Sequence, residues 1–148
     1  MLNNDYKDTL SVLSKRKVKF ILVGAYAMAV QGYPRSTMDI DLWIIPDPEN
    51  ALLVLQALDE FGAPAGELSP EDLQKKDLIF QIGVAPRRID IITSVDGLTF
   101  EEAYSNSETI EIEGISVQVL SISDLIKNKR STGRIKDQAD AEELEKLL

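Results

Sequence analysis

Two aspartates, Asp39 and Asp41, lie one residue apart in a segment that is otherwise apolar, and Leu-Trp-Ile-Ile follows directly at 42–45. This composition predicts an interior β-strand. Because side chains alternate along a strand, Asp39 and Asp41 point to one face while Ile40 and Leu42 point to the other. Like charges held this close need a cation or a proton between them, and hard oxygen ligands suit Mg²⁺ or Mn²⁺. The pair therefore predicts half of a metal site.

A third aspartate, Asp90, lies in a second apolar segment that is rich in isoleucine. An unpaired carboxylate in such surroundings destabilises a fold unless a counterion lies beside it. Taken alone, such an aspartate more often caps a turn or pairs with an arginine, here Arg87 or Arg88. Together with Asp39 and Asp41, it favours a catalytic group of three carboxylates that also bind the metal.

The chain contains neither histidine nor cysteine. A Ser-His-Asp triad, a cysteine nucleophile and a typical zinc site are therefore excluded. Carboxylates, lysine, arginine, hydroxyl groups and a hard metal ion remain, and these suit phosphoryl or nucleotidyl transfer better than acyl transfer. Neither a P-loop nor a Gly-x-Gly-x-x-Gly motif occurs, which argues against ATPases and dehydrogenases.

The length of 148 residues suits one domain, and the sequence shows no linker or repeat. With 16 basic and 25 acidic residues, the formal charge of −9 argues against broad binding to duplex DNA. No apolar run approaches the roughly 20 residues that cross a bilayer, and no secretion leader opens the sequence. We expect a cytoplasmic protein with no membrane partner.

Turn residues and hydrophobic periodicity predict an α/β (α+β) domain, a mixed β-sheet flanked by helices, with a C-terminal helical segment at about 121–148. Strands are expected at 19–23, 38–45, 78–84, 88–93, 109–113 and 115–120. Helices are expected at 4–17, 25–30, 48–62, 122–130 and 136–148, with a shorter helical turn after Ser69. Trp43 is expected in the core.

Gly24 follows one predicted strand and precedes a helix, where backbone N–H groups can approach a phosphate closely. Alone, such a glycine usually only makes a turn. Arg35 and Thr37 flank the aspartate strand and could bind phosphate or orient Asp39, although Arg35 could equally pair with a structural acid.

A dense group of cations precedes the last predicted helix and consists of Lys127, Lys129, Arg130, Arg134 and Lys136. A charge run is usually a solvated helix face. In a protein of net charge −9 this group is also a candidate clamp for a triphosphate, and Lys129 is its first choice, with Arg130 and Lys136 beside it. Asp137 and Asp140, three residues apart on a helix, are expected to form structural ion pairs.

The order of Gly24, a helix, the Asp39-x-Asp41 strand and a later strand with Asp90 resembles the DNA polymerase β nucleotidyltransferase superfamily. The sequence departs from that pattern at Ala25, where the family has glycine or serine at the nucleotide's phosphates. Residues 23–43 and 124–140 also resemble small bacterial stand-alone nucleotidyltransferases, including the AbiEii-like toxin group.

The resemblance implies a nucleotidyltransferase-like fold and transfer of a nucleoside monophosphate from an NTP such as ATP to an acceptor hydroxyl, with release of pyrophosphate. It implies that Asp39 and Asp41 ligate two Mg²⁺ ions and that Asp90 binds the second ion and helps to deprotonate the acceptor. It further implies that Gly24 and Ala25 bind the nucleotide. The acceptor, whether RNA, protein or small molecule, is left open.

Two other functions remain compatible with the sequence. One is a non-catalytic nucleotide-binding or regulatory module, for instance a component of a toxin–antitoxin pair, and the other is a metal-dependent phosphohydrolase. The short chain leaves little room for acceptor binding, which a homodimer or a partner antitoxin could supply.

Overall fold

The computed structural model of the protein describes residues 2–33, 37, 39–63, 66 and 68–148. Its strands are β1 (Phe20–Val23), β2 (Asp39–Ile44), β3 (Ile79–Ile82), β4 (Arg88–Ile92), β5 (Glu108–Ile112) and β6 (Ile115–Val119). Its helices are α1 (Asn4–Lys15), α2 (Gly24–Val30), α3 (Pro48–Phe61), the 3₁₀ turn η1 (Asp72–Gln74), α4 (Phe100–Asn106), α5 (Ile122–Ser131) and α6 (Ile135–Glu145).

The strands form one six-stranded mixed sheet in the order β3-β4-β2-β1-β6-β5. The neighbours β2 and β4 run parallel, as do β1 and β6, whereas the other pairs are antiparallel. The predicted mixed sheet flanked by helices is therefore confirmed. Strand β2 lies in the interior of the sheet between β1 and β4, which fixes the surroundings of both its aspartates.

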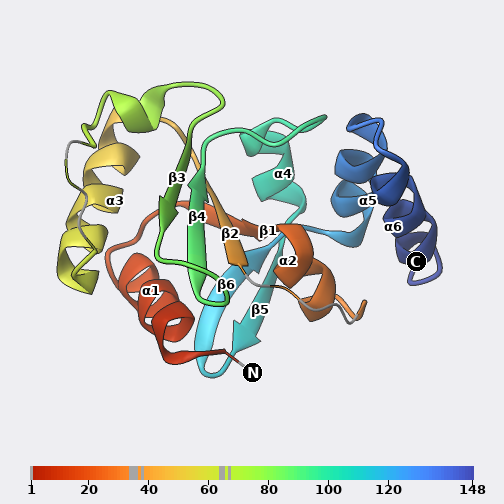
Figure 1. The fold of residues 1–148 in the computed structure, drawn as a ribbon, viewed down its shortest axis with the longest axis horizontal. Helices are drawn as coiled ribbons and strands as arrows, with labels where there is room; N and C mark the ends of the chain where they lie inside the picture. Colours follow the sequence, from red (N-terminus) through yellow and green to blue (C-terminus); the bar gives the residue numbers. More distant parts are fainter. Residues whose placement is uncertain (1, 34–36, 38, 64–65, 67) are drawn as a thin grey trace.

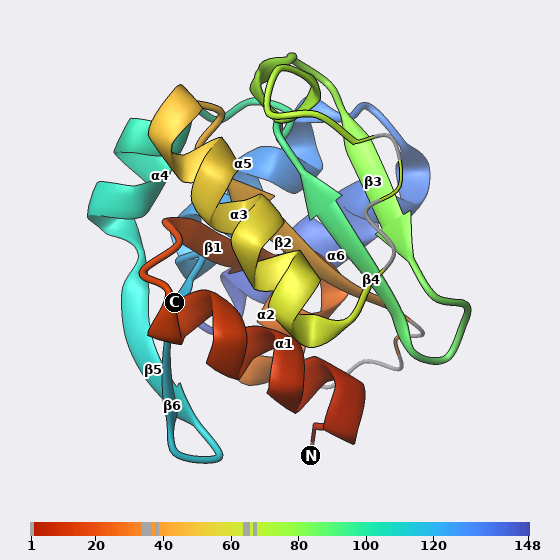
Figure 2. The ribbon, with the colours of Figure 1, turned by 90° about the vertical axis from the view of Figure 1, so that its left-hand side faces the viewer.

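Helices cover both faces of this sheet. Helices α1 and α3 lie on one face, at the left of Figure 1 and in front in Figure 2, and α2 and α5 lie on the other. Helix α6 packs along α5. None of the helices in the described part of the chain is long and apolar enough to span a membrane.

Strand β2 separates two environments through its alternating side chains. Ile40, Leu42 and Ile44 are almost fully buried, as the pattern predicts, and belong to the core. Trp43 is also buried and meets Phe100 of α4 edge-on, with ring centroids 5.2 Å apart. The prediction that Trp43 lies in the core is confirmed.

Helix α4 is absent from the sequence-based prediction, because its seven residues are too few for a clear periodic pattern. A local signal does exist: Thr99 precedes the helix, and Glu101 and Glu102 lie in its first turn, where carboxylates favour the helix dipole. Several other bounds differ by one to three residues from the prediction, as is usual at element ends.

Asn50 joins helix α3 to the ends of two strands through partly buried hydrogen bonds. Its Oδ1 accepts from the backbone N–H of Lys19 at 2.8 Å, and its Nδ2 donates to the carbonyls of Lys19 and Ile45 at 3.0 and 3.1 Å. The side chain also lies at the start of α3, where Asp47 caps the backbone N–H of Asn50 at 2.7 Å.

We predict that Asn50→Ala lowers the free energy of unfolding by about 1 to 3 kcal/mol, because backbone groups of Lys19 and Ile45 lose their hydrogen-bond partners. Urea denaturation followed by circular dichroism measures this loss. Leu52→Ala on the exposed side of the same helix is the control and should change stability by less than about 0.5 kcal/mol. An equal loss of unfolding free energy in both variants would contradict the stabilising role of the Asn50 hydrogen bonds.

Candidate active site

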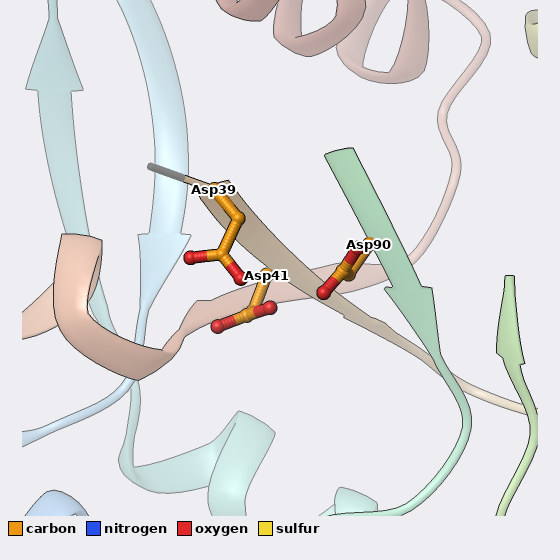
Figure 3. Close-up of side chains that lie close together, drawn as sticks. All are labelled: Asp39, Asp41 and Asp90. Atoms are coloured by element: carbon orange, nitrogen blue, oxygen red, sulfur yellow. The ribbon is translucent and has the colours of Figure 1, made fainter. Parts of the chain in front are cut away.

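The three aspartates that the sequence singled out lie together on one face of the neighbouring strands β2 and β4 (Figure 3). One carboxylate oxygen from each of Asp39, Asp41 and Asp90 lies within 4.8 Å of the others. Strand register is the cause, because the parallel pairing of β2 with β4 sets Asp41 directly opposite Asp90. Asp90 is buried, while Asp39 and Asp41 are partly exposed to solvent. The set of hard oxygen donors is suited to Mg²⁺ or Mn²⁺.

Arg88 is the cation that contacts this group. It lies opposite Asp39 in the strand register and two residues before Asp90 on the same face. Its Nη2 donates to Asp39 Oδ2 at 2.6 Å and to Asp90 Oδ2 at 3.2 Å, and its Nε donates to Asp90 Oδ1 at 3.1 Å. Asp90 therefore both joins the acidic group and pairs with an arginine.

Thr37 holds Asp39 from the other side. Its Oγ1 lies 2.7 Å from the Asp39 carbonyl oxygen and 3.1 Å from Asp39 Oδ1, within hydrogen-bonding distance of both. These contacts suit the predicted role of orienting Asp39, and the binding of phosphate by Thr37 stays a prediction. Arg35 lies outside the described residues.

Gly24 makes room for Asp41. Its φ of +71° is a conformation that glycine adopts readily, and a Cβ at this position would overlap Asp41 Oδ2 and lie 3.1 Å from Asp41 Cγ. The sequence suggested only a close approach of phosphate to this glycine. The structure adds a stricter requirement, because any side chain at residue 24 would displace a carboxylate of the acidic group.

Burial and neighbouring negative charge raise the pKa values of Asp41 and Asp90. Burial raises the pKa of Asp41 to about 7, the charges of Asp39 and Asp90 add to the rise, and the charge of Arg88 opposes it. Burial also raises the pKa of Asp90, again against the effect of Arg88. A metal-free acidic group thus carries electrostatic strain that a cation would relieve.

A cleft of about 320 Å³ opens beside Asp41. It lies where β1, β2 and β4 meet the C-terminal helices, and its lining residues are Val23, Gly24, Ala25, Asp41, Ile92, Ser94, Val95, Asp96, Asn128, Lys129 and Arg134. A larger cavity of about 680 Å³ lies between α2 and β5, and Thr37, which contacts Asp39, is one of its lining residues. The cleft beside Asp41 combines a carboxylate of the acidic group with two cations and with the backbone N–H groups at the start of α2.

The predicted cations differ in their positions. Lys129 lines the cleft, but its Nζ pairs with Asp137 Oδ1 at 3.2 Å and Asp140 Oδ2 at 3.1 Å. Arg134 also lines it and pairs with Asp137 at 2.8 Å. Although burial raises the pKa of Asp137, hydrogen bonds from Thr132 and Lys129 and nearby positive charge hold it below its ordinary value. The structural ion pairs expected for Asp137 and Asp140 are present.

Arg130 and Lys136 are not among the described residues that line the cleft. Arg130 pairs with Glu145 of α6 on the exposed side of the helix pair, and Lys136 lies exposed on α6. Lys129 precedes Arg130 by one position on α5 and therefore faces a different way. Arg134 lies outside the helix, at the N-cap of α6, and lines the cleft from there.

Sequence reasoning missed the wall formed by Ser94, Asp96 and Asn128. Asn128 Nδ2 donates to the Asp96 carbonyl at 3.0 Å, and a Cβ on Gly97 would overlap Ser131 of α5. These contacts hold the segment after β4 against α5. In the sequence, only the position of Ser94–Gly97 could have indicated this wall. The segment comes soon after the strand that carries Asp90, and loops at such strand ends often carry ligand-binding residues.

Comparisons with known proteins agree with this geometry. Residues 4–147 match the family described as nucleotidyltransferase of unknown function (DUF6036). The chain belongs to this family. It also superposes on the crystal structure of a candidate nucleotidyltransferase from Thermotoga maritima with a TM-score of 0.61 and 19% identity, over 99% of this chain and 94% of that chain. No curated protein matches it.

Membership of the DUF6036 family and the nucleotidyltransferase-like fold support the superfamily that the motifs indicated. The family and the fold point to nucleotidyl transfer as the general activity. The narrower resemblance to the AbiEii-like toxin group stays a prediction.

We predict that Gly24→Ala is more damaging than another alanine substitution at a glycine of similar backbone conformation. Gly114 also has positive φ, +86°, but open space surrounds it, so Gly114→Ala introduces backbone strain alone. Gly24→Ala adds the overlap with Asp41 and should lower the free energy of unfolding by roughly 1 to 3 kcal/mol more than the control. Chemical denaturation of both variants checks this, and equal losses would contradict the close packing.

We also predict that Asp41→Asn stabilises the metal-free protein at alkaline pH. The pKa of this carboxyl is about 3.9 in the unfolded chain and about 7 in the folded protein. The folded protein therefore becomes less stable as the pH increases between these two values. Above pH 7 this destabilisation is present in the wild type and absent from the variant. Because solvent screens the partly exposed Asp41, we expect the variant to gain on the order of 1 kcal/mol, less than the full pKa shift implies.

Thermal unfolding in EDTA at pH 5 and pH 8 measures this gain, which should be larger at pH 8. Asp59→Asn removes an exposed carboxylate of α3 and is the matched control. A variant that is equally or less stable than the wild type at pH 8 would show that Asp41 carries no such strain.

Proposed function

We propose that the protein is a metal-dependent nucleotidyltransferase that moves a nucleoside monophosphate from an NTP to an acceptor hydroxyl and releases pyrophosphate. One observation carries this proposal: Asp39, Asp41 and Asp90 converge within 4.8 Å on interior strands, beside a cleft that also contains Lys129 and Arg134. Family membership supports the reaction class, and the donor chemistry supports the metal.

Asp39, Asp41 and Asp90 would hold the divalent cations. Bound there, Mg²⁺ or Mn²⁺ would neutralise phosphate charge and lower the pKa of the acceptor hydroxyl, so that no histidine is needed as a base. The raised pKa of Asp41 fits this role, because a group of strained carboxylates gains from a cation. Asp90, the buried member of the group, would also help to take up the acceptor proton.

The chain's other residues would bind and orient the nucleotide. The first backbone N–H groups of α2, at Gly24 and Ala25, border the cleft and would face the phosphates. Arg134, which is exposed at the cleft, and Lys129 would attract the triphosphate. Thr37 would keep Asp39 in place, and Arg35 is retained as a candidate phosphate ligand.

A non-catalytic nucleotide-binding module, such as a toxin–antitoxin component, is the alternative, and one observation favours it. The cations closest to the site are already paired, Arg88 with Asp39 and Asp90, and Lys129 with Asp137 and Asp140. Such a module would bind nucleotide and metal without transferring anything. A phosphohydrolase would release free nucleotide or phosphate instead of a modified acceptor.

We expect the protein, incubated with Mg²⁺ or Mn²⁺, each α-labelled NTP in turn and host lysate, to attach the label to an acceptor. Asp41→Asn should lower this transfer roughly a hundredfold or more, because an amide cannot replace the charge of a carboxylate ligand. Asp59→Asn should leave transfer unchanged. Labelling by Asp41→Asn at the wild-type rate would refute the metal assignment, and nucleotide binding without any labelled acceptor would favour the module.

A further inference from the structure

The guanidinium of Arg88 lies against the acids to which the proposal assigns the metal. It makes a two-point contact with Asp90 and a third with Asp39, at 2.6 to 3.2 Å. Arg88 and Asp39 are only partly exposed, at 35% and 26% of their side-chain surface, and Asp90 is 8% exposed. In such surroundings charged hydrogen bonds are stronger than at an open surface.

The backbone enforces this contact. Arg88 faces Asp39 across the parallel β2–β4 pair and precedes Asp90 by two residues, so its side chain begins on the acidic face of the sheet. Tyr6 of α1 donates its hydroxyl to the carbonyls of Arg88 and Pro86, each at 3.1 Å. The main chain at residue 88 is therefore held on both sides, while the long side chain keeps access to solvent.

A cation bound by Asp39 and Asp90 would need the same carboxylate oxygens that Arg88 contacts. Asp90 Oδ1 accepts a hydrogen bond from Arg88 Nε, and Asp90 Oδ2 accepts one from Nη2. Asp39 Oδ2 also accepts from Nη2. Thr37 lies near the other oxygen of Asp39, Oδ1. Metal binding and the Arg88 ion pairs thus compete for one set of lone pairs.

We propose that Arg88 is a built-in competitor of the divalent cation. It neutralises the acidic group when no metal is bound and has to leave Asp39 and at least one oxygen of Asp90 when metal binds. This inference rests on the proposed metal dependence. Because only molecules whose guanidinium has moved away can bind metal fully, Arg88 weakens the apparent metal affinity and keeps the metal-free protein stable.

A different role for Arg88 gives the opposite expectation. If its fork served to hold Asp90 in the orientation that a metal requires, removal of Arg88 would weaken metal binding, as the loss of an outer-shell partner does in metal sites. The sign of the change in affinity therefore separates competition from support.

The test is a titration of the protein with Mn²⁺, in which the electron paramagnetic resonance signal reports free ion. We expect Arg88→Gln to bind Mn²⁺ about tenfold more tightly than the wild type. Arg88→Lys, which keeps the charge but not the fork, should fall between them. Arg87→Gln removes the neighbouring arginine, which lies 3.9 Å from Asp5 and away from the acidic group, and should not change the affinity.

A second readout is the unfolding temperature, measured with EDTA and with Mn²⁺. Arg88→Gln should be less stable than the wild type in EDTA and should gain more from Mn²⁺. Equal or weaker Mn²⁺ binding by Arg88→Gln would overturn the inference while leaving the proposed function intact. Absence of Mn²⁺ binding from wild type and variants alike would overturn both.

Discussion

The register between β2 and β4 is the constraint on which the site depends. Parallel pairing places Asp41 beside Asp90 and Arg88 beside Asp39, so three carboxylates and one guanidinium share a small volume. A slip of one residue would turn these side chains to the opposite face and bring isoleucines into their place. The apolar alternation that fixes the register is therefore also what positions the charges.

Apolar side chains on the other face of the sheet offset the destabilisation that the acidic group causes. On the opposite face of β2, Ile40, Leu42 and Ile44 are buried, and each such side chain contributes about 1.5 to 3 kcal/mol to the fold. This burial holds the strands together against the repulsion and desolvation of the acids. On the charged face the neighbouring residues reduce the cost: Gly24 leaves space for Asp41, and Arg88 supplies a counter-charge.

The sequence predicts the parts of the site that depend on local pattern. Period-two alternation is enough to locate the aspartate strands and their common face, because it needs no knowledge of the partner strand. The overlap of a residue-24 Cβ with Asp41 follows only from the pairing of β1 with β2, and the clamp of Lys129 by Asp137 and Asp140 only from the packing of α5 on α6. A count of cations cannot tell Lys129 and Arg134, which line the cleft, from Arg130 and Lys136, which do not.

The persistence of the acidic group bears on the choice between enzyme and inert module. The carboxyl of Asp41, whose pKa is raised to about 7, destabilises the metal-free fold at neutral and alkaline pH, and an amide at position 41 would remove this destabilisation. A fold that needed Asp41 only as a structural residue would gain from losing it. Strain that remains at a cleft is typical of a site that binds a ligand, because the ligand then relieves what the empty fold tolerates. The strained aspartates, the glycine that gives them room and the adjoining cations are therefore the features on which the proposed metal-dependent transfer rests.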